Sequence, residues 1–185
     1  MMPEISLNIL DVAQNSVTAG ASLIRIDIKA ETLADLLTVS ISDNGKGMSE
    51  EQVKNVTNPF YTTRTTRKVG LGVPFFKMAA EITGGSFNIQ SELGKGTTTT
   101  AAFKTSSIDR MPLGDIAGTM TGLIGPSPDI DFLLTVSVDE KEMAMDTREF
   151  RQVLGEDVSL SEPEVLAYIE EYIRSGMAEI GADSL

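Results

Sequence analysis

The sequence Asp-Asn-Gly-Lys-Gly-Met at residues 43–48 directly follows an alternating apolar run at residues 36–41. Such alternation is typical of a half-buried β-strand, so Asp43 is predicted to lie where a strand opens into a loop. Gly45 and Gly47 allow the backbone to take positive φ and to approach a ligand closely. A carboxylate at this place is suited to accept a hydrogen bond from an exocyclic amine such as that of adenine. Taken alone, the segment also fits an ordinary turn, which Asp-Asn-Gly sequences commonly form.

Three further segments accompany this one in a fixed order. Residues 11–21 (Asp-Val-Ala-Gln-Asn-Ser-Val-Thr-Ala-Gly-Ala) precede it, and residues 58–64 (Asn-Pro-Phe-Tyr-Thr-Thr-Arg), 69–73 (Val-Gly-Leu-Gly-Val) and 94–98 (Gly-Lys-Gly-Thr-Thr) follow it. The set resembles the GHKL superfamily: the ATP-binding domains of histidine kinases, anti-sigma-factor kinases, MutL-type repair ATPases, gyrase B subunits and heat-shock chaperone ATPases. The resemblance covers residues 5 to 105 and looks most like the histidine-kinase branch. It implies that the protein binds ATP.

Residue periodicity within this region predicts its secondary structure. Apolar residues three and four apart predict helices, and strict alternation predicts strands. The expected helices are residues 5–18, 49–56 and 73–82, and the expected strands are residues 23–30, 36–42, 86–91 and 97–104. This order predicts an α+β two-layer sandwich, with helices on one face of a mixed, mostly antiparallel sheet. In the family, that architecture is the Bergerat-type fold, with nucleotide on the helical side.

The resemblance assigns chemistry to the first predicted helix. Asp11 and Asn15 are four residues apart, so both side chains project from one side of it. The family counterpart of Asn15 supplies an oxygen ligand to the Mg²⁺ that bridges the phosphates, and an amide oxygen suits that hard ion. The counterpart of Asp11 is a glutamate general base in repair ATPases and anti-sigma kinases, but often an asparagine in histidine kinases. Asp11 is therefore either a catalytic base or a group beside the metal, and a solvated polar pair is the plain alternative.

The other nucleotide contacts that the resemblance implies lie in loops around the sheet. They are Asp43, Gly45, Gly47, Met48, Phe60, Arg67, Lys68, Gly70, Leu71, Gly72 and Thr97. Residues 57–69 correspond to the family's ATP lid, although a plain polar loop is the alternative interpretation. Arg64 falls where the histidine-kinase pattern has lysine, so it is the first candidate for stabilising charge on the γ-phosphate during catalysis. The glycines at 70 and 72 precede a predicted helix, whose N-terminal N–H groups favour phosphate oxygens.

Composition excludes several classes of function. The 185 residues include no cysteine and no histidine, so thiolate and imidazole metal sites, a Ser-His-Asp triad and a phospho-accepting histidine in this chain are excluded. No Gly-x-x-x-x-Gly-Lys-Ser/Thr run occurs, which excludes a P-loop. No apolar run is long enough to span a bilayer, and the N-terminus lacks the features of a signal peptide. We therefore expect a cytoplasmic protein without membrane insertion.

Charge is distributed unevenly along the chain. Residues 1–105 hold 10 acidic and 10 basic side chains, whereas residues 106–185 hold 17 acidic and 5 basic ones, which accounts for the net charge of −12. Such an acidic segment does not favour nucleic-acid binding. Its charge serves either solubility or recognition of a basic protein partner.

Residues 106–185 carry no motif of the superfamily. They are predicted to contain a helix at 111–124 interrupted by glycines, a break at 125–128, a hairpin of strands 131–138 and 142–146, and an amphipathic helix at 164–180. The hairpin is expected either to extend the main sheet or to pack in a homodimer. The final helix is expected to pack on the chain's own core, with partner binding as the alternative. We therefore divide the chain into an ATP-binding domain, residues 1–105, and an acidic extension, residues 106–185, which forms either a domain or an appendage.

Three functional hypotheses follow from these motifs. The leading one is a Mg-ATP-dependent transfer of the γ-phosphoryl group to a separate protein. Because this chain has no histidine, the acceptor must lie on another protein or be a Ser, Thr or Asp side chain. The second is a conformational ATPase with water as the acceptor. The third is a non-catalytic regulatory subunit that senses ATP or ADP.

Overall fold

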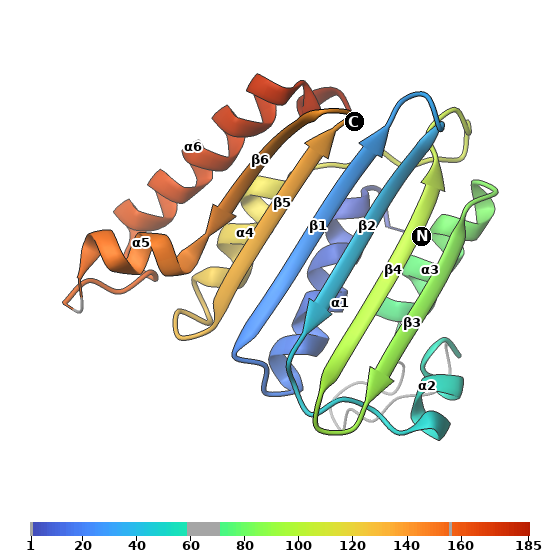
Figure 1. Ribbon diagram of the computed structural model, residues 1–185, viewed down its shortest axis with the longest axis horizontal. Helices are drawn as coiled ribbons and strands as arrows, with labels where there is room; N and C mark the ends of the chain where they lie inside the picture. Colours follow the sequence, from blue (N-terminus) through green and yellow to red (C-terminus); the bar gives the residue numbers. More distant parts are fainter. Residues whose placement is uncertain (1, 59–70, 156) are drawn as a thin grey trace.

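The computed structural model describes residues 2–58, 71–155 and 157–185 (Figure 1). Within these residues the strands are β1 (Leu23–Glu31), β2 (Leu36–Asp43), β3 (Ser86–Glu92), β4 (Gly96–Lys104), β5 (Asp131–Val138) and β6 (Lys141–Asp146). The helices are α1 (Ile5–Thr18), α2 (Glu50–Val56), α3 (Gly72–Ile82), α4 (Ile116–Ile124), α5 (Thr147–Leu154) and α6 (Pro163–Ile180), followed by the short 3₁₀ helix η1 (Ala182–Ser184). The helices and strands predicted for the first 105 residues agree with these bounds to within one or two residues.

The strands form one sheet with the order β3-β4-β2-β1-β5-β6. Every neighbouring pair is antiparallel except β1 and β5, which run parallel. A parallel pair needs a crossover connection, and here α4 lies within the chain that leads into β5. The predicted mixed, mostly antiparallel sheet is confirmed. The hairpin β5–β6 extends the main sheet beside β1. Extension of the sheet was one of the two alternatives expected for this hairpin, the other being packing in a homodimer.

The helices α1, α3, α4 and α6 cover one face of the sheet (Figure 1). Strand alternation explains why, because apolar residues at every second position point to that face. In β1, Ile24, Ile26 and Ile28 are buried, whereas Arg25 and Lys29 on the opposite face are exposed. Full burial of one such side chain stabilises the fold by roughly 1.5–3 kcal/mol. The sheet therefore has a dry helical face and a polar open face.

The start of α1 is held by a segment from the other half of the chain. The backbone N–H groups of Ile5 and Ser6 donate to the carbonyls of Pro112 and Leu113, at 3.0 and 2.8 Å. These groups belong to the first turn of a helix and have no partner within it. The segment after β4 therefore completes the N-terminus of the helix that carries Asp11.

The prediction of a helix from residue 111 was wrong at its beginning. The helix α4 starts at Ile116, with Asp115 as its N-cap: the carboxylate accepts a hydrogen bond from Gly118 N at 3.0 Å. Gly114 has φ +84°, which ends any helical path there. The glycines within α4 do not interrupt it, since burial of residues such as Met120 and Leu123 outweighs their low helix propensity.

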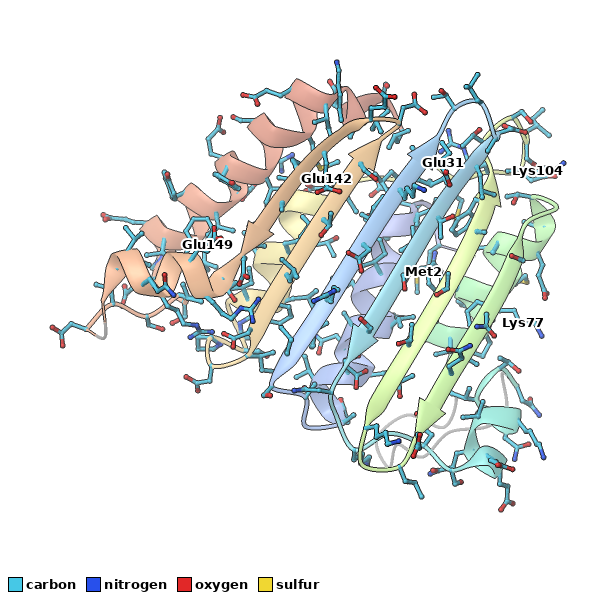
Figure 2. All side chains as sticks on the ribbon, in the orientation of Figure 1. Met2, Glu31, Lys77, Lys104, Glu142 and Glu149 are labelled. Carbon is cyan, nitrogen blue, oxygen red and sulfur yellow. The ribbon has the colours of Figure 1, made fainter. Side chains whose placement is uncertain are left out.

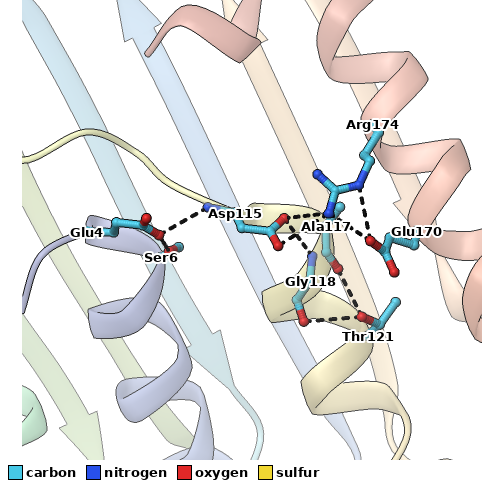
Figure 3. A network of polar contacts seen from close by, with 8 residues as sticks. All are labelled: Glu4, Ser6, Asp115, Ala117, Gly118, Thr121, Glu170 and Arg174. Atoms are coloured by element: carbon cyan, nitrogen blue, oxygen red, sulfur yellow. Dashed lines mark hydrogen bonds and ion pairs between the residues drawn. The ribbon is translucent and has the colours of Figure 1, made fainter.

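The helix α6 packs on the core with the apolar stripe that its sequence predicts. Ile169 and Ile173 are fully buried, and Met177 is nearly so. Arg174 forms ion pairs with Glu170 at 2.7 Å and with Asp115, the N-cap of α4, at 3.1 Å (Figure 3). The main interpretation, a helix docked on its own chain, is confirmed for this face.

The helix α5 was missed by the sequence-based prediction. Asp146 caps it by accepting a hydrogen bond from Arg148 N at 2.9 Å, and the buried Thr147 accepts one from Phe132 N at 2.8 Å. An Asp-Thr pair just after a strand was the available signal, because both residues favour a helix N-terminus. Among the residues described, no helix is both long and apolar enough to cross a membrane.

Candidate functional site

Three polar side chains form a row at one end of the helical face of the sheet. Asp43 on β2 is in register with Thr97 on β4, and Thr97 is in register with Ser91 on β3. Residues directly opposite each other on neighbouring strands share a face. This is the face of the buried Val39 and Ile41, because Asp43 continues their alternation. The apolar core thus gives way to a polar edge at the place where β2 ends.

The Asp43 carboxylate is held by two donors. The Ser16 hydroxyl on α1 donates to Oδ2 at 2.6 Å, and the backbone N–H of Gly45 donates to Oδ1 at 2.8 Å. Asp43 remains partly exposed, and each oxygen keeps a lone pair for a further donor. The result is a fixed hydrogen-bond acceptor between the end of β2 and the last turn of α1.

Ser16 is a site residue that sequence reasoning missed. Its position belongs to the buried stripe of α1 with Ile9 and Val12, so helical spacing by itself predicts only a place on the apolar face. Its side chain is only 4% exposed. A buried hydroxyl needs a hydrogen-bond partner, so a serine within an apolar stripe was the signal that could have found it.

The loop after Asp43 is anchored on both sides. The Asn44 Oδ1 atom accepts hydrogen bonds from the N–H groups of Ser22 and Leu23, at 2.9 and 3.0 Å. Lys46 N donates to Ala19 O at the end of α1, and Lys46 O accepts from Gly94 N in the β3–β4 turn. The predicted binding loop therefore connects α1 with the β3–β4 turn, and hydrogen bonds on both sides hold it in place beside Asp43.

The other end of this loop meets the polar row through Ser91, a second residue that was missed. Met48 N donates to Ser91 Oγ at 2.8 Å, and Ser91 Oγ lies 2.8 Å from Thr97 Oγ1. Met48 and Thr97, both predicted to contact nucleotide, are thus connected through one hydroxyl. A serine in a strand gives no such indication by itself, because only the strand register places it beside Thr97.

A second group of predicted residues meets where α1 faces the start of α3. Asp11 and Asn15 lie one turn apart on α1, and both are partly exposed. A Cβ placed on Gly72 would lie 3.1 Å from Asp11 Cβ, so the glycine allows the first turn of α3 to approach Asp11. Leu71, the N-cap, is exposed and has no polar side chain to bond the helix N–H groups. These N–H groups and the helix dipole favour an anion beside Asp11 and Asn15.

Five predicted residues, Phe60, Arg64, Arg67, Lys68 and Gly70, lie outside the described residues. The lid roles of the first four, and the phosphate contact of Gly70, remain predictions. The structure does bring together the other predicted residues, in two groups that both border α1. One group holds a fixed carboxylate, and the other holds a carboxylate and an amide beside a helix N-terminus.

This fold and these motifs define a class of protein. The chain belongs to the family described as Histidine kinase-, DNA gyrase B-, and HSP90-like ATPase, which matches residues 3–107. It therefore contains an ATP-binding domain of the histidine kinase-like type, and the resemblance seen in the sequence is confirmed.

Several bacterial proteins are similar to this part of the chain. A putative sensor protein of Shewanella frigidimarina is 34% identical over 95 residues, which are 51% of this chain and 14% of that protein. Sporulation kinase D of Bacillus subtilis is 30% identical over 99 residues, 54% of this chain and 19% of the kinase. Sensor protein SrrB of Staphylococcus aureus is 35% identical over 102 residues, 52% of this chain and 17% of SrrB. The chain thus spans less than a fifth of each of these relatives.

A solved structure shares the fold. The crystal structure of the N-terminal domain of a DNA repair protein superposes with a TM-score of 0.54 at 15% identity, over 78% of this chain and 53% of that chain. At this identity, the likeness concerns the fold alone.

The Ser16→Ala variant tests the hydrogen bond that positions Asp43. We expect the dissociation constant for ATP to rise about tenfold, since a hydrogen bond to a charged group contributes about 1.5–3 kcal/mol. Isothermal titration calorimetry would measure it. Thr18→Ala is the matched control, because that exposed hydroxyl on the same helix donates only to Gln14 O. Equal affinities for the two variants would contradict a role for Ser16 in the site.

Proposed function

We propose that this protein binds Mg-ATP and transfers the γ-phosphoryl group to a separate protein, in signalling or regulation within the cytoplasm. The observation that carries the proposal is the placement of Asp11 beside the N-terminus of α3, with Asn15 one turn further along the same helix, whose Ser16 holds Asp43. One helix thus borders both an acceptor suited to adenine and a region suited to phosphates. The division into a nucleotide-binding part, residues 1–105, and an acidic extension, residues 106–185, is part of this proposal.

The Asp43 carboxylate would bind the base. Its two oxygens already accept hydrogen bonds from Ser16 and Gly45, so the remaining lone pairs point in fixed directions. The exocyclic amine of adenine is a donor, and a guanine carbonyl at the same place would meet a carboxylate as acceptor against acceptor. We therefore expect selectivity for adenine nucleotides. Thr97, in register with Asp43, would complete the contact through its hydroxyl.

Asn15 would hold Mg²⁺ through its amide oxygen. The described residues include no cluster of three or more carboxylates that could hold a metal by themselves. A single amide oxygen, that of Asn15, fits Mg²⁺, which commonly takes one or two protein ligands and otherwise phosphate oxygens and water. When bound, the ion would neutralise phosphate charge. The N-terminal N–H groups of α3 would hold further phosphate oxygens.

Asp11 would act on the nucleophile. An acceptor side chain attacks the γ-phosphorus and forms a new bond to it, while the bond to the β,γ-bridging oxygen breaks and ADP leaves. Asp11 would orient the acceptor and take its proton. The cations Arg64, Arg67 and Lys68 would stabilise charge on the transferred group, as the lid prediction suggests. Positioning and electrostatics supply most of the rate in such transfers.

The acceptor is proposed to lie on another protein because the chain contains no histidine. Incubation with γ-labelled ATP and Mg²⁺, with and without a lysate of the source cell, tests this. Label on a second protein band is the expected result. Release of free phosphate alone would replace the proposal with a conformational ATPase, and nucleotide binding without either product would leave a nucleotide sensor.

The Asp11→Asn variant separates binding from turnover. We expect ATP affinity to change less than about twofold, while turnover falls by about 10²–10⁴, the contribution typical of a general base. The rate is measured in the same assay, by quenching the reaction at successive times and counting the label that has been transferred. Asp11→Glu is the matched control, since it keeps the carboxylate and should retain most of the turnover. Unchanged turnover in Asp11→Asn would remove Asp11 from the mechanism.

A further inference from the structure

The helices α5 and α6 meet in an exposed aromatic cluster at the β6 edge of the sheet. The Phe150 ring of α5 contacts Tyr168 and Tyr172 of α6 edge-on, with centroid distances of 6.1 and 5.7 Å. Tyr168 is 64% exposed and Tyr172 43% exposed. Val153, three residues after Phe150, is 87% exposed. Aromatic and apolar side chains therefore gather where none of the described residues covers them fully.

Carboxylates accompany this cluster on α6. Helical spacing places Glu164, Tyr168, Glu171 and Tyr172 on one side of the helix, and both glutamates are exposed. We call the six residues Phe150, Val153, Glu164, Tyr168, Glu171 and Tyr172 the acidic aromatic surface. Figure 2 shows further carboxylates in this part of the molecule, Glu142 on β6 and Glu149 on α5, whereas Lys77 and Lys104 lie on the far side.

Nearby arginines do not neutralise this surface, because each has an acidic partner of its own. Arg148 pairs with Asp146 at 2.7 Å, and Arg151 pairs with Asp131 at 3.2 Å. Arg174 pairs with Glu170 and Asp115 on another side of α6. From residue 139 to residue 185 the sequence holds 13 acidic and 4 basic side chains. The surface is therefore negative as well as aromatic.

Solubility alone explains exposed carboxylates but not exposed aromatic rings among them. Tyrosine is enriched in protein–protein interfaces, where it contributes a large contact area at low entropic cost. A tyrosine face also attracts Lys and Arg through cation–π contact, and carboxylates reinforce that preference. We propose that the acidic aromatic surface binds a basic amphipathic segment of a separate protein.

Charge and hydrogen bonding decide between this occupant and two others. A second copy of the chain would bring two negative surfaces together, and such juxtaposition is repulsive. Strand addition at β6 is hindered, because the Tyr172 hydroxyl donates to Ala144 O of that edge strand at 3.1 Å. The remaining occupant is a segment of a separate protein that binds through side-chain contacts. Its lysines or arginines would contact Glu164, Glu171 and Tyr168, and its apolar groups would contact Val153.

The test uses a fluorescent synthetic peptide of lysine and leucine, with the leucines at helical spacing, titrated in the absence of nucleotide. The proposal does not rest on the proposed function, since the surface contains no residue of the nucleotide site. Tyr168→Ala is expected to raise the dissociation constant about tenfold, as loss of a central aromatic contact commonly does. Tyr168→Phe keeps the ring and should retain the affinity. Since Tyr168 is largely exposed, both variants should unfold at nearly the wild-type temperature.

The charge contribution has its own matched control. Glu164→Gln combined with Glu171→Gln should weaken peptide binding about fivefold at low salt, and added salt should reduce the difference. Glu50→Gln combined with Glu51→Gln removes the same charge from α2, which packs on β3 at the other edge of the sheet, and should leave binding unchanged. Equal loss in both pairs, or full affinity in Tyr168→Ala, would overturn the proposal. A dimer in light scattering that dissociates in Tyr168→Ala would assign the surface to a second copy instead.

Discussion

Replacing Asp43 with asparagine is expected to abolish measurable nucleotide binding, with the dissociation constant for ATP rising at least about 100-fold. In the native site both carboxylate oxygens accept hydrogen bonds, one from Ser16 Oγ and one from Gly45 N. An asparagine has only one oxygen, so its NH₂ group would face one of these two donors. The side chain would then turn or lose its position, and the acceptor proposed for the adenine amine would be lost with it. Titration calorimetry with ATP measures the loss.

Asp27→Asn provides the matched control for this variant. Asp27 is also a partly exposed strand carboxylate, but it lies on β1 with its side chain on the open face, opposite to the helical layer. The substitution removes the same charge and should leave ATP affinity unchanged. If Asp43→Asn bound ATP as well as Asp27→Asn, the assignment of this site would be wrong, although the family and fold would stand.

Replacing Gly47 with alanine is expected to destabilise the protein strongly, with a loss of at least about 3 kcal/mol in the free energy of unfolding. Gly47 has φ +66°, and an added Cβ would lie 2.0 Å from the Glu92 carbonyl oxygen. The neighbouring atom is backbone at the end of β3, so it cannot rotate away as a side chain would. The loop at 43–48 would have to separate from the turn, which breaks the hydrogen bond between Lys46 O and Gly94 N. Urea unfolding would measure the stability.

Gly94→Ala separates the clash from the backbone conformation. Gly94 has φ +78° in the same turn, but an added Cβ would meet no atom within 4 Å. Its alanine variant should therefore lose only the roughly 1–2 kcal/mol of a left-handed conformation. Nucleotide affinity should fall in Gly47→Ala and stay near wild type in Gly94→Ala. Similar losses of stability in the two variants would show that contact with Glu92 does not constrain the loop.

Most of the secondary structure could be predicted because it depends on local patterns. The helix at 5–18 matches α1 at both ends, and Ser49 with Gln52, a pattern typical of a helix start, forms a capping box for α2 with hydrogen bonds in both directions. Such features involve residues within one or two turns of each other, so short-range periodicity and capping chemistry suffice. The family motifs are similarly local, and they led to Asp43 and Thr97 without any structure.

The misses share a different physical origin. The start of α4 at Ile116 depends on Pro112 and Leu113 serving the N-terminus of α1, a contact across more than 100 residues. The helix α5 begins where Thr147 accepts a hydrogen bond from Phe132 N, and Phe150, Val153 and Leu154 at helical spacing were a local signal that was overlooked. Hydrogen bonds between distant segments therefore set where α4 and α5 begin.

The sequence by itself determined the family, the loop that follows β2 at residues 43–48 and the α+β layering, because these follow from motifs and periods within short windows. Only the tertiary structure decided that Ser16 holds Asp43, that Ser91 connects Met48 with Thr97, and that β5 lies parallel to β1. Each of these depends on strand register or helix packing between distant segments. A serine within an apolar stripe signals a buried hydroxyl that needs a partner, but only the packing of α1 against β2 shows that this partner is Asp43.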